Sequence, residues 1–365
     1  MKKEIYSEIE TALMILKDKS KPVLVTGANG YIGSWITKEL LDNNYTVHAT
    51  VRDISNKNKI NHLLEISSKS NGKLKLFECD LLIENSFFPA MQNCSIVFHT
   101  ASPFKLNFKN PKEELINPAL NGTKNVINCA NKIDSVKRIV ITSSCAAIYT
   151  DAKELLNYEN GEINEKIWNK TASYKYNPYS YSKTLAEKKA WEMYENQTQW
   201  DLVVLNPSFV LGPSLNSKFN TSESYNIIKQ IGEGFFKFGI PKLPIGVVDV
   251  RDLAKAHYKL AFNTDCFGRY IVNSSNTNFY ELSQLLYEKY GNEYQIPKKY
   301  SPKWITWLFG YFFNKNLTKK YVSNNINYEF KANNSRIKRE LDNKFTPLIK
   351  TVEDTFESII NSGEI

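Results

Sequence analysis

An alternation of apolar, β-rich runs with helical segments, beginning at Pro22, limits the fold of this chain more than any other feature. The strand candidates are nearly continuous apolar runs, as expected of strands that helices cover on both faces. The expected strands are 23–25, 45–51, 74–79, 96–100, 136–143 and 202–205, and the expected helices are 31–41, 57–66, a short one near 84–91, 111–131 and 178–195. This rhythm predicts an α/β fold with a doubly wound parallel sheet.

The chain has 365 residues, which exceeds the size at which a single hydrophobic core stops growing and predicts two unequal parts. Residues 1–20 form an expected N-terminal extension, with apolar positions at helical spacing over 5–17. Residues 21–207 carry the strand–helix rhythm and form the expected main domain. Residues 208–365, where Gly and Pro interrupt the pattern, mainly form a smaller C-terminal lobe, and segments around 247–275 are expected to return to the main domain.

Several classes of protein are excluded by composition. The densest apolar run, Trp304–Phe313, is half the roughly 20 residues that a membrane-spanning helix needs. The start of the chain has no apolar core of a secretory signal, which favours a cytoplasmic location. The five cysteines are an odd number without a C-x-x-C pair, and the four histidines lie far apart, so neither a disulfide framework nor a metal site is expected.

The net charge of +9 is concentrated in one stretch. Residues 298–339 hold ten Lys and Arg against one acid, Glu329, and are rich in aromatic residues. One interpretation is a surface for anionic lipid or nucleic acid. The interpretation favoured by the clustering of the aromatic residues is a solvated basic face whose rings pack inward or line a substrate pocket. We therefore expect no nucleic-acid partner and no integral membrane association.

The turn after the first expected strand has the glycine spacing G-x-x-G-x-x-G over Gly27, Gly30 and Gly33. Gly27 permits a tight turn, Gly30 lets the backbone approach a pyrophosphate, and Gly33 allows close packing of helix on strand. Free N–H groups at the helix start favour an anion. This predicts a dinucleotide site in a Rossmann-type domain. Its candidate cofactor-binding residues are Thr26, Gly27, Asn29, Gly30, Tyr31, Ile32 and Gly33.

The end of the second expected strand distinguishes between dinucleotides. An acid there binds the ribose 2′-hydroxyl of NAD, whereas a cation meets the 2′-phosphate of NADP. The sequence has Arg52 followed by Asp53, with Lys59 in the next helix. Because Arg52 suits bidentate phosphate recognition and Lys59 adds a second positive charge, NADP is favoured over NAD.

Tyr179 and Lys183 form a Y-x-x-x-K pair at the start of an expected helix, so both lie on one helix face. The preceding strand ends at Ser144, and ligands of open α/β sheets bind at such strand ends. Carbonyl reduction needs a proton donor, and we expect Lys183 to lower the pKa of Tyr179 from about 10. Ser144, Tyr179 and Lys183 are therefore the candidate catalytic trio. The same spacing recurs at Tyr149/Lys153, Tyr225/Lys229, Tyr294/Lys298 and Tyr311/Lys315, without this position in the fold.

With these motifs, the chain resembles the extended short-chain dehydrogenases/reductases. The closest group contains dihydroflavonol 4-reductases, cinnamoyl-CoA reductases and methylglyoxal-type aldehyde reductases. The resemblance covers about residues 22–364. Its motifs are the glycine loop 25–35, 49–53, 80–81, 99–103, 142–144, 179–187, 206–208 and 248–252.

The resemblance implies an NADPH-dependent reductase of an aldehyde or ketone, with further cofactor contacts. Asp80 and Leu81 would face the adenine, Ala101 the ribose and pyrophosphate, and Pro207 and Ser208 the nicotinamide. Ser102 and Tyr149 are candidate substrate contacts. In the plant flavonoid enzymes an Asn stands where this chain has Tyr149, so a small generic carbonyl substrate is favoured over a dihydroflavonol.

Three alternatives stay open. A nucleotide-sugar epimerase or dehydratase shares the fold and the trio, although dehydratases of that type typically carry an Asp-Glu pair where Cys145 and Ala146 follow Ser144. A 3β-hydroxysteroid-type dehydrogenase could use the aromatic C-terminal lobe for a flat apolar ligand. A non-catalytic NADP sensor would keep the glycine loop but tends to lose the Tyr–Lys pair. Both a monomer and a homodimer are compatible with the sequence.

Overall fold

The computed structural model describes residues 16–102, 109–220, 222–341 and 344–365. The expected N-terminal extension lies almost wholly outside these residues, as does most of the helix predicted over 5–17.

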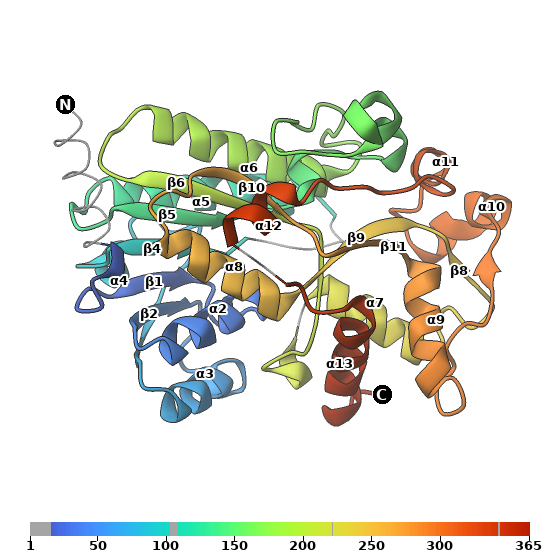
Figure 1. The fold of residues 1–365 in the computed structure, drawn as a ribbon, viewed down its shortest axis with the longest axis horizontal. Coiled ribbons are helices and arrows are strands. Elements are labelled where there is room, and N and C mark those ends of the chain that lie inside the picture. Colours follow the sequence, from blue (N-terminus) through green and yellow to red (C-terminus); the bar gives the residue numbers. More distant parts are fainter. Residues whose placement is uncertain (1–15, 103–108, 221, 342–343) are drawn as a thin grey trace.

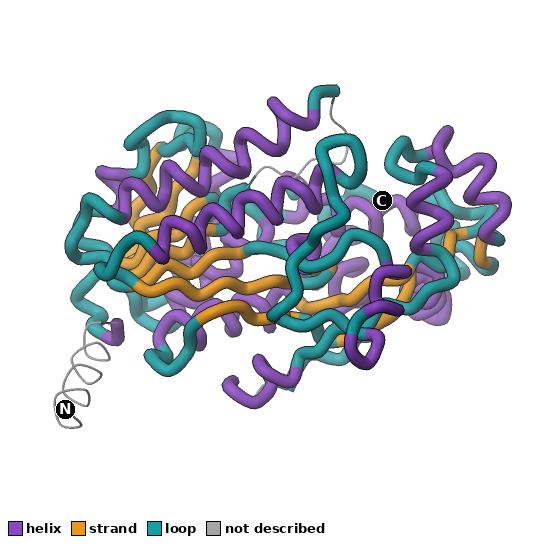
Figure 2. The backbone as a smooth tube through the Cα atoms, turned by 90° about the horizontal axis from the view of Figure 1, so that it is seen from above, coloured by secondary structure: helices purple, strands orange, loops and turns teal. Residues whose placement is uncertain are grey.

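A seven-stranded, entirely parallel sheet forms the centre of the main part (Figures 1 and 2). Its strand order is β10-β6-β5-β4-β1-β2-β3. The strands are β1 (Val23–Thr26), β2 (Thr46–Val51), β3 (Lys73–Glu78), β4 (Ile96–His99), β5 (Arg138–Thr142), β6 (Asp201–Pro207) and β10 (Gly268–Val272). From β1 the chain first adds β2 and β3 on one side, and then crosses over to add β4, β5 and β6 on the other side. The direction in which strands are added therefore reverses between β1 and β4. The expected doubly wound α/β fold is confirmed, and a crevice for ligands is expected at this reversal.

Helices cover both faces of this sheet (Figure 1). One face carries α2 (Tyr31–Asp42), α3 (Lys57–Lys69) and α8 (Val250–Phe262), and the other carries α4 (Phe88–Met91), α5 (Asn117–Ala130) and α6 (Pro178–Glu195). Successive side chains of β1 enter opposite cores: Val23 and Val25 pack with α2 and α8, and Leu24 packs with α5. This is why the strand reads as an unbroken apolar run.

Two details differ from the sequence-based elements. The helix predicted over 111–131 is divided into a π-helical turn, Lys112–Ile116, and α5. Strand β10 pairs with β6 and completes the sheet, although no strand was assigned there from the sequence.

The division into domains at residue 207 stays a prediction. Short 3-10 turns occupy Cys145–Ala147, Ala152–Asn157, Glu159–Gly161 and Ser217–Phe219.

The C-terminal lobe has its own apolar core. A three-stranded sheet of β7 (Phe209–Leu211), β9 (Pro244–Asp249) and β11 (Ser275–Asn278) packs with α7 (Glu223–Gly232), α9 (Phe279–Tyr290) and α13 (Leu348–Asn361). Beyond them lie α10 (Lys303–Phe313), α11 (Lys319–Asn325) and the small sheet of β8 (Ile240–Pro241) and β12 (Tyr300–Ser301), while α12 (Ser335–Leu341) returns to β10. Among the described helices, none has both the length and the apolar character needed to cross a bilayer.

Candidate active site

The turn between β1 and α2 is shaped by its glycines. Gly27 has a φ of +63°, a left-handed conformation that glycine adopts without strain. A Cβ at Gly33 would lie 2.3 Å from the carbonyl oxygen of Gly27, so only glycine lets α2 pack this closely on the turn. Gly30 is exposed and N-caps α2 without a side chain. The turn thus presents backbone N–H groups at a helix start, a cradle that fits a pyrophosphate.

Thr26 joins the glycine turn to the end of β4. Its hydroxyl oxygen accepts hydrogen bonds from the backbone N–H groups of Thr100 and Ala101, both at 3.1 Å, and lies 3.0 Å from Nδ1 of His99. Since two N–H groups occupy the hydroxyl lone pairs, its proton is donated to Nδ1 of His99. Burial, with a smaller contribution from Lys183, lowers the pKa of His99 to about 3, so this ring is neutral. Thr26 therefore holds Ala101 beside Gly27.

The remaining candidate cofactor-binding residues of the glycine turn are Asn29, Tyr31 and Ile32. The Tyr31 hydroxyl donates to the carbonyl oxygen of Gly212 at 2.7 Å, and burial raises its pKa well above 10. Ile32 packs against the core on the α2 side of the sheet, and Asn29 is partly buried. Tyr31 thus ties the start of α2 to the loop after β7.

At the end of β2, Arg52 and Lys59 are exposed and Asp53 is occupied by its own loop. The Asp53 carboxylate accepts from the N–H and hydroxyl of Ser55, at 2.8 and 2.5 Å, and from the N–H of Asn56 at 3.3 Å. The bond from the Ser55 hydroxyl is the main cause of the lowered pKa of this carboxyl. These three bonds go to Oδ1 of the exposed Asp53, so this carboxylate holds the loop that precedes α3, beside two exposed cations.

The candidate adenine contacts are fixed by α5. The carboxylate of Asp80 accepts from the N–H of Leu82 at 2.8 Å, and Asn125 of α5 donates to the carbonyl oxygen of Leu81 at 2.7 Å. The Leu81 side chain lies 3.0 Å from where a Cβ of Gly122 would stand. The loop after β3 is therefore held closely against α5.

Ser144 and Tyr179 meet at the end of β5. The Tyr179 hydroxyl is hydrogen-bonded to the side chain of Ser144. The hydroxyl oxygen of Ser144 also accepts from the N–H of Ala146 at 3.1 Å, which fixes it at the start of a 3-10 turn. Asn177 N-caps α6 in a left-handed conformation, and Pro178 is its first residue, so α6 begins directly beside Ser144.

Lys183 lies one turn along α6, with Nζ 5.9 Å from the centre of the Tyr179 ring. The lysine is buried, and burial lowers its pKa to about 8 against the opposing effect of Glu187. Burial also raises the pKa of Tyr179 to about 12, with the Ser144 hydrogen bond acting the other way. The expected lowering of the Tyr179 pKa by Lys183 is not seen in this arrangement, because burial is the largest cause and acts in the opposite direction.

Glu187 lies one further turn along α6 and forms hydrogen bonds with residues that neighbour the trio. This role was not predicted from the sequence. Its carboxylate accepts from the Ser143 hydroxyl, from Nδ2 of Asn206 at 2.7 Å and from Nε of Arg269 at 2.6 Å. Both members of the Glu187–Arg269 ion pair are buried. The spacing Tyr179, Lys183, Glu187 was a visible signal, since all three positions share one helix face. Arg269 was not visible, because it comes from β10.

A small cavity of about 20 Å³ lies against this group, large enough for about one water molecule. Its lining includes His99, Ala101, Ser102, Lys183 and Glu187. Ser102, a candidate substrate contact, therefore lies with Lys183 at the bottom of the crevice. The residues brought together here come from the ends of neighbouring strands and from α6.

The remaining candidates lie on the side of the C-terminal lobe. Ser208 follows β6, and its N–H donates to the carbonyl oxygen of Val272 at 3.1 Å, which positions Pro207 and Ser208 across from β10. The Tyr149 ring packs on Phe330 at 5.1 Å between centroids, in a cluster apart from the small cavity. Tyr149 is thus placed at the junction with the lobe.

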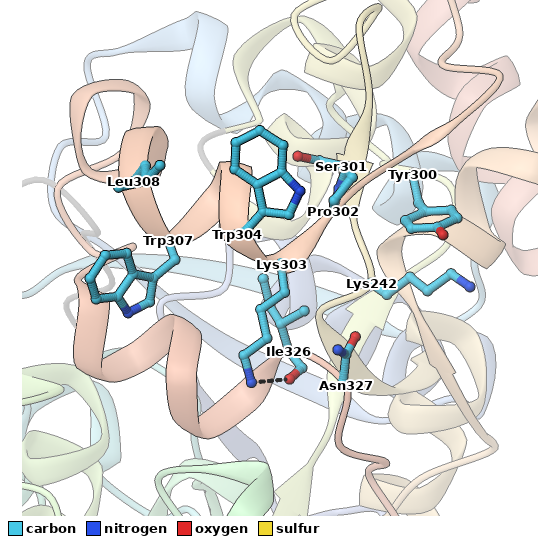
Figure 3. Close-up of a pocket in the computed structure, with 10 residues that line it drawn as sticks. All are labelled: Lys242, Tyr300, Ser301, Pro302, Lys303, Trp304, Trp307, Leu308, Ile326 and Asn327. Atoms are coloured by element: carbon cyan, nitrogen blue, oxygen red, sulfur yellow. Dashed lines mark hydrogen bonds between the residues drawn. The ribbon is translucent and has the colours of Figure 1, made fainter.

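Two observations concern other kinds of site. In residues 16–102, 109–220, 222–341 and 344–365, no group of three or more His, Cys, Asp or Glu could hold a metal ion. A cavity of about 810 Å³ is lined by Lys242 and residues between 300 and 327 (Figure 3). It belongs to the C-terminal lobe and not to the trio.

Comparison with known proteins agrees with this geometry. Residues 23–272 match the NAD dependent epimerase/dehydratase family. A cinnamoyl-CoA reductase of Medicago truncatula is 39% identical over 280 residues, which cover 76% of this chain and 83% of that protein. A bifunctional dihydroflavonol 4-reductase/flavanone 4-reductase of Malus domestica is 35% identical, covering 77% and 80%. The structure of Gre2 of Candida albicans in complex with NADPH superposes with a TM-score of 0.76 at 29% identity, covering 94% and 99%.

The chain belongs to the NAD dependent epimerase/dehydratase family, the extended short-chain dehydrogenases/reductases. The resemblance inferred from the sequence motifs is thereby confirmed, and the relatives named above are reductases.

Proposed function

We propose that this protein is an NADPH-dependent reductase that converts an aldehyde or ketone to an alcohol. The observation that carries the proposal is the hydrogen bond between Tyr179 and Ser144, with Lys183 one helical turn away, beside the glycine cradle. The relatives that are reductases support the reaction type.

When bound, the nicotinamide supplies the hydride that reduces the carbonyl carbon. Ser144, held by the N–H of Ala146, orients the carbonyl oxygen. Tyr179 donates its phenolic proton to that oxygen as the C=O π bond breaks, so that C–H and O–H bonds form and the product is an alcohol. With a pKa of about 12, Tyr179 is protonated at neutral pH, which suits an acid in the direction of reduction. Lys183 stabilises the tyrosinate that remains until water returns the proton.

The preference for NADPH rests on Arg52 and Lys59. Both are exposed at the end of β2, where Oδ1 of Asp53 accepts from Ser55 and Asn56. An anionic 2′-phosphate would therefore meet two cations, whereas one carboxylate, Asp53, is the group beside them that suits a ribose hydroxyl. The Gre2 structure, which contains NADPH, supports the same assignment.

The proposed cofactor contacts are Thr26, Gly27, Asn29, Gly30, Tyr31, Ile32, Gly33, Arg52, Lys59, Asp80, Leu81, Ala101, Tyr179, Lys183, Pro207 and Ser208. Ser102 and Tyr149 are the proposed substrate contacts. Because the bulky Tyr149 ring lies against Phe330, a compact carbonyl compound is favoured.

The test is to mix the purified protein with NADPH and a panel of aldehydes and ketones, and to follow oxidation of the nicotinamide by absorbance. Carbonyl-dependent oxidation that Tyr179→Phe abolishes is expected. NADPH binding without turnover of any carbonyl would favour the NADP sensor, and conversion of a nucleotide sugar without net oxidation would favour an epimerase. Turnover of a steroid alone would favour the 3β-hydroxysteroid-type dehydrogenase.

A further inference from the structure

Helix α10 presents its large apolar side chains to solvent. Trp304, Leu308, Tyr311 and Phe312 are 63, 44, 53 and 83% exposed. Their spacing of four, three and one residues places them along one helix face. The expectation that the aromatic residues of 298–339 pack inward is therefore wrong for these side chains, although Trp304 and Trp307 of this helix line a cavity. An apolar face turned outward is the opposite of what a surface helix of a globular protein shows.

The packing of α10 explains its orientation. Its buried positions are small: Thr306 and Gly310 face inward, and a Cβ at Gly310 would lie 3.2 Å from the Leu317 side chain. Trp307 fastens the pair of helices, because its Nε1 donates to the Ser323 hydroxyl of α11 at 3.1 Å. The close packing at Thr306 and Gly310 leaves no room for large side chains at these two positions, and the rings of Tyr311 and Phe312 project outward.

A second segment, distant in sequence, joins this face. Strand β8 pairs with β12, which brings the loop before β8 beside Tyr300 and Ser301. Phe238 in that loop is 92% exposed, and Gly239 approaches so closely that a Cβ there would lie 3.1 Å from the Ser301 nitrogen. We call the exposed apolar side chains and lysines of 235–242 and 298–320 the lysine–aromatic surface. Figure 1 shows the elements that carry it, α10 and β8, at one end of the molecule, with the seven-stranded sheet toward the other.

The charge of this surface has a single sign. The segments 235–242 and 298–320 contain eight lysines and no acidic residue. Nζ of Lys237, Lys242 and Lys319 lies 5.2, 4.4 and 4.3 Å from the centres of the Phe238, Tyr300 and Trp307 rings. Lysines placed in this way cover apolar surface with their stems and keep their charged ends near water.

The cavity of about 810 Å³ opens on the same surface (Figure 3). The rings of Tyr300, Trp304 and Trp307 lie around it. The ammonium group of Lys303 donates to the carbonyl oxygens of Ser323 and Ile326, at 3.0 and 2.8 Å, so it caps the end of α11. Lys242 also lines the cavity and is exposed, so its ammonium group can bind an anion at the rim of the cavity.

We propose that the lysine–aromatic surface docks the protein reversibly on a membrane that contains anionic phospholipid. Aromatic and leucine side chains on one helix face, flanked by lysines, are the composition that lies in the headgroup region of a bilayer. Each lysine near an anionic leaflet adds to the attraction. Nucleic acid is a poorer fit, because a helix face that includes Leu308 and Phe312 offers few hydrogen-bond donors for phosphates or bases. A second copy of this chain, equally basic here, would meet like charge.

The test is flotation of the full chain with vesicles of phosphatidylcholine alone or mixed with phosphatidylserine. We expect flotation with the anionic vesicles that weakens as salt is raised. Trp304→Ser/Leu308→Ser/Phe312→Ser should reduce the bound fraction about tenfold or more, since it removes the apolar contribution to insertion. Lys242→Glu/Lys299→Glu/Lys315→Glu should reduce it on anionic vesicles. A matched control, Leu156→Ser/Phe267→Ser, replaces residues of similar exposure elsewhere and should float like the wild type.

Several results would overturn the proposal. They are failure of the wild type to float at low salt, equal flotation with neutral and anionic vesicles, and full flotation of the triple serine variant. Retention on duplex DNA without flotation would assign the surface to nucleic acid, and dissociation of a larger assembly by the triple variant without flotation would assign it to a second copy. The thermal unfolding temperature of each variant shows whether the fold is intact. If the triple serine variant unfolds, the loss of flotation expected of the triple Lys→Glu variant still tests the proposal.

Discussion

Helices α6 and α10 depart from the usual arrangement of apolar groups inside and polar groups outside in opposite directions. α6 buries Lys183 and Glu187, and Arg269 of β10 forms an ion pair with Glu187. α10 exposes Trp304 and Phe312 and packs through small residues. If α6 holds its charges for the proposed chemistry and α10 offers apolar surface to the proposed membrane, substitutions in the two helices should act on different properties.

The largest expected effect is on turnover, from Tyr179→Phe. Removal of the proton donor should lower kcat about 10²–10⁴-fold, the range of general acid catalysis, with little change in NADPH affinity. Tyr174→Phe, at a tyrosine that is 53% exposed, is the matched control and should keep full activity. Steady-state kinetics and cofactor titration measure both, and an active phenylalanine variant would remove Tyr179 from the mechanism.

The next effect is on stability, from Glu187→Gln. This change leaves Arg269 buried without its carboxylate, and loss of one partner of a buried ion pair costs about 3–5 kcal/mol in the free energy of unfolding. Glu357→Gln, which removes an exposed partner of Lys289, should cost less than about 1 kcal/mol. Urea unfolding of the two variants separates these cases, and equal losses would show that the site under α6 needs no buried charge.

The third effect is on the choice of cofactor, from Arg52→Asp. Loss of one charge-assisted contact should lower kcat/KM for NADPH about ten- to a hundredfold and leave that for NADH nearly unchanged. Lys69→Asp, at the other end of α3, makes the same charge change on an exposed residue and should leave the preference as it is. If the wild type uses NADH and NADPH equally well, the assignment to NADP is wrong.

The fourth effect is a dependence on pH that comes from Lys183. A lysine is cationic below its pKa, so kcat/KM for reduction should fall about tenfold per unit as pH rises above about 8. The stability contribution has the opposite sign: between about 8 and 10.5 the unfolded lysine holds its proton and the folded one does not, so this group makes the folded state more stable as pH rises. Both trends should be absent in Lys183→Met, measured beside the wild type.

The smallest effect is expected on the surface of α10. Phe312→Ser, at a residue that is 83% exposed, should change the free energy of unfolding by no more than about 0.5 kcal/mol. Phe356→Ala, at a fully buried ring in the core of the lobe, should cost about 3–5 kcal/mol. A large loss from Phe312→Ser in thermal or urea unfolding would mean that this ring has a structural role and would weaken the contrast with α6.

The alternation of apolar runs and helices determined the main sheet, and the glycine spacing located the tight turn between β1 and α2, because both depend on short-range backbone and packing requirements. The pair Tyr179 and Lys183 was also readable, since a separation of four residues places two side chains on one helix face. A return of segments around 247–275 to the main domain was expected, but the strand β10 itself was not assigned, because its pairing with β6 joins segments that lie far apart in the sequence.

Only the tertiary structure decided the environments on which chemistry depends. The pKa of Tyr179 is raised mainly by burial, which the spacing of residues along the chain does not reveal. The Arg269 partner of Glu187 is 82 residues away in sequence. The outward face of α10 follows from the fit of Gly310 against Leu317, and its union with the loop at Phe238 follows from the pairing of β8 with β12. Burial, charge pairing and exposure depend on contacts between distant segments, and those contacts exist only once the chain has folded.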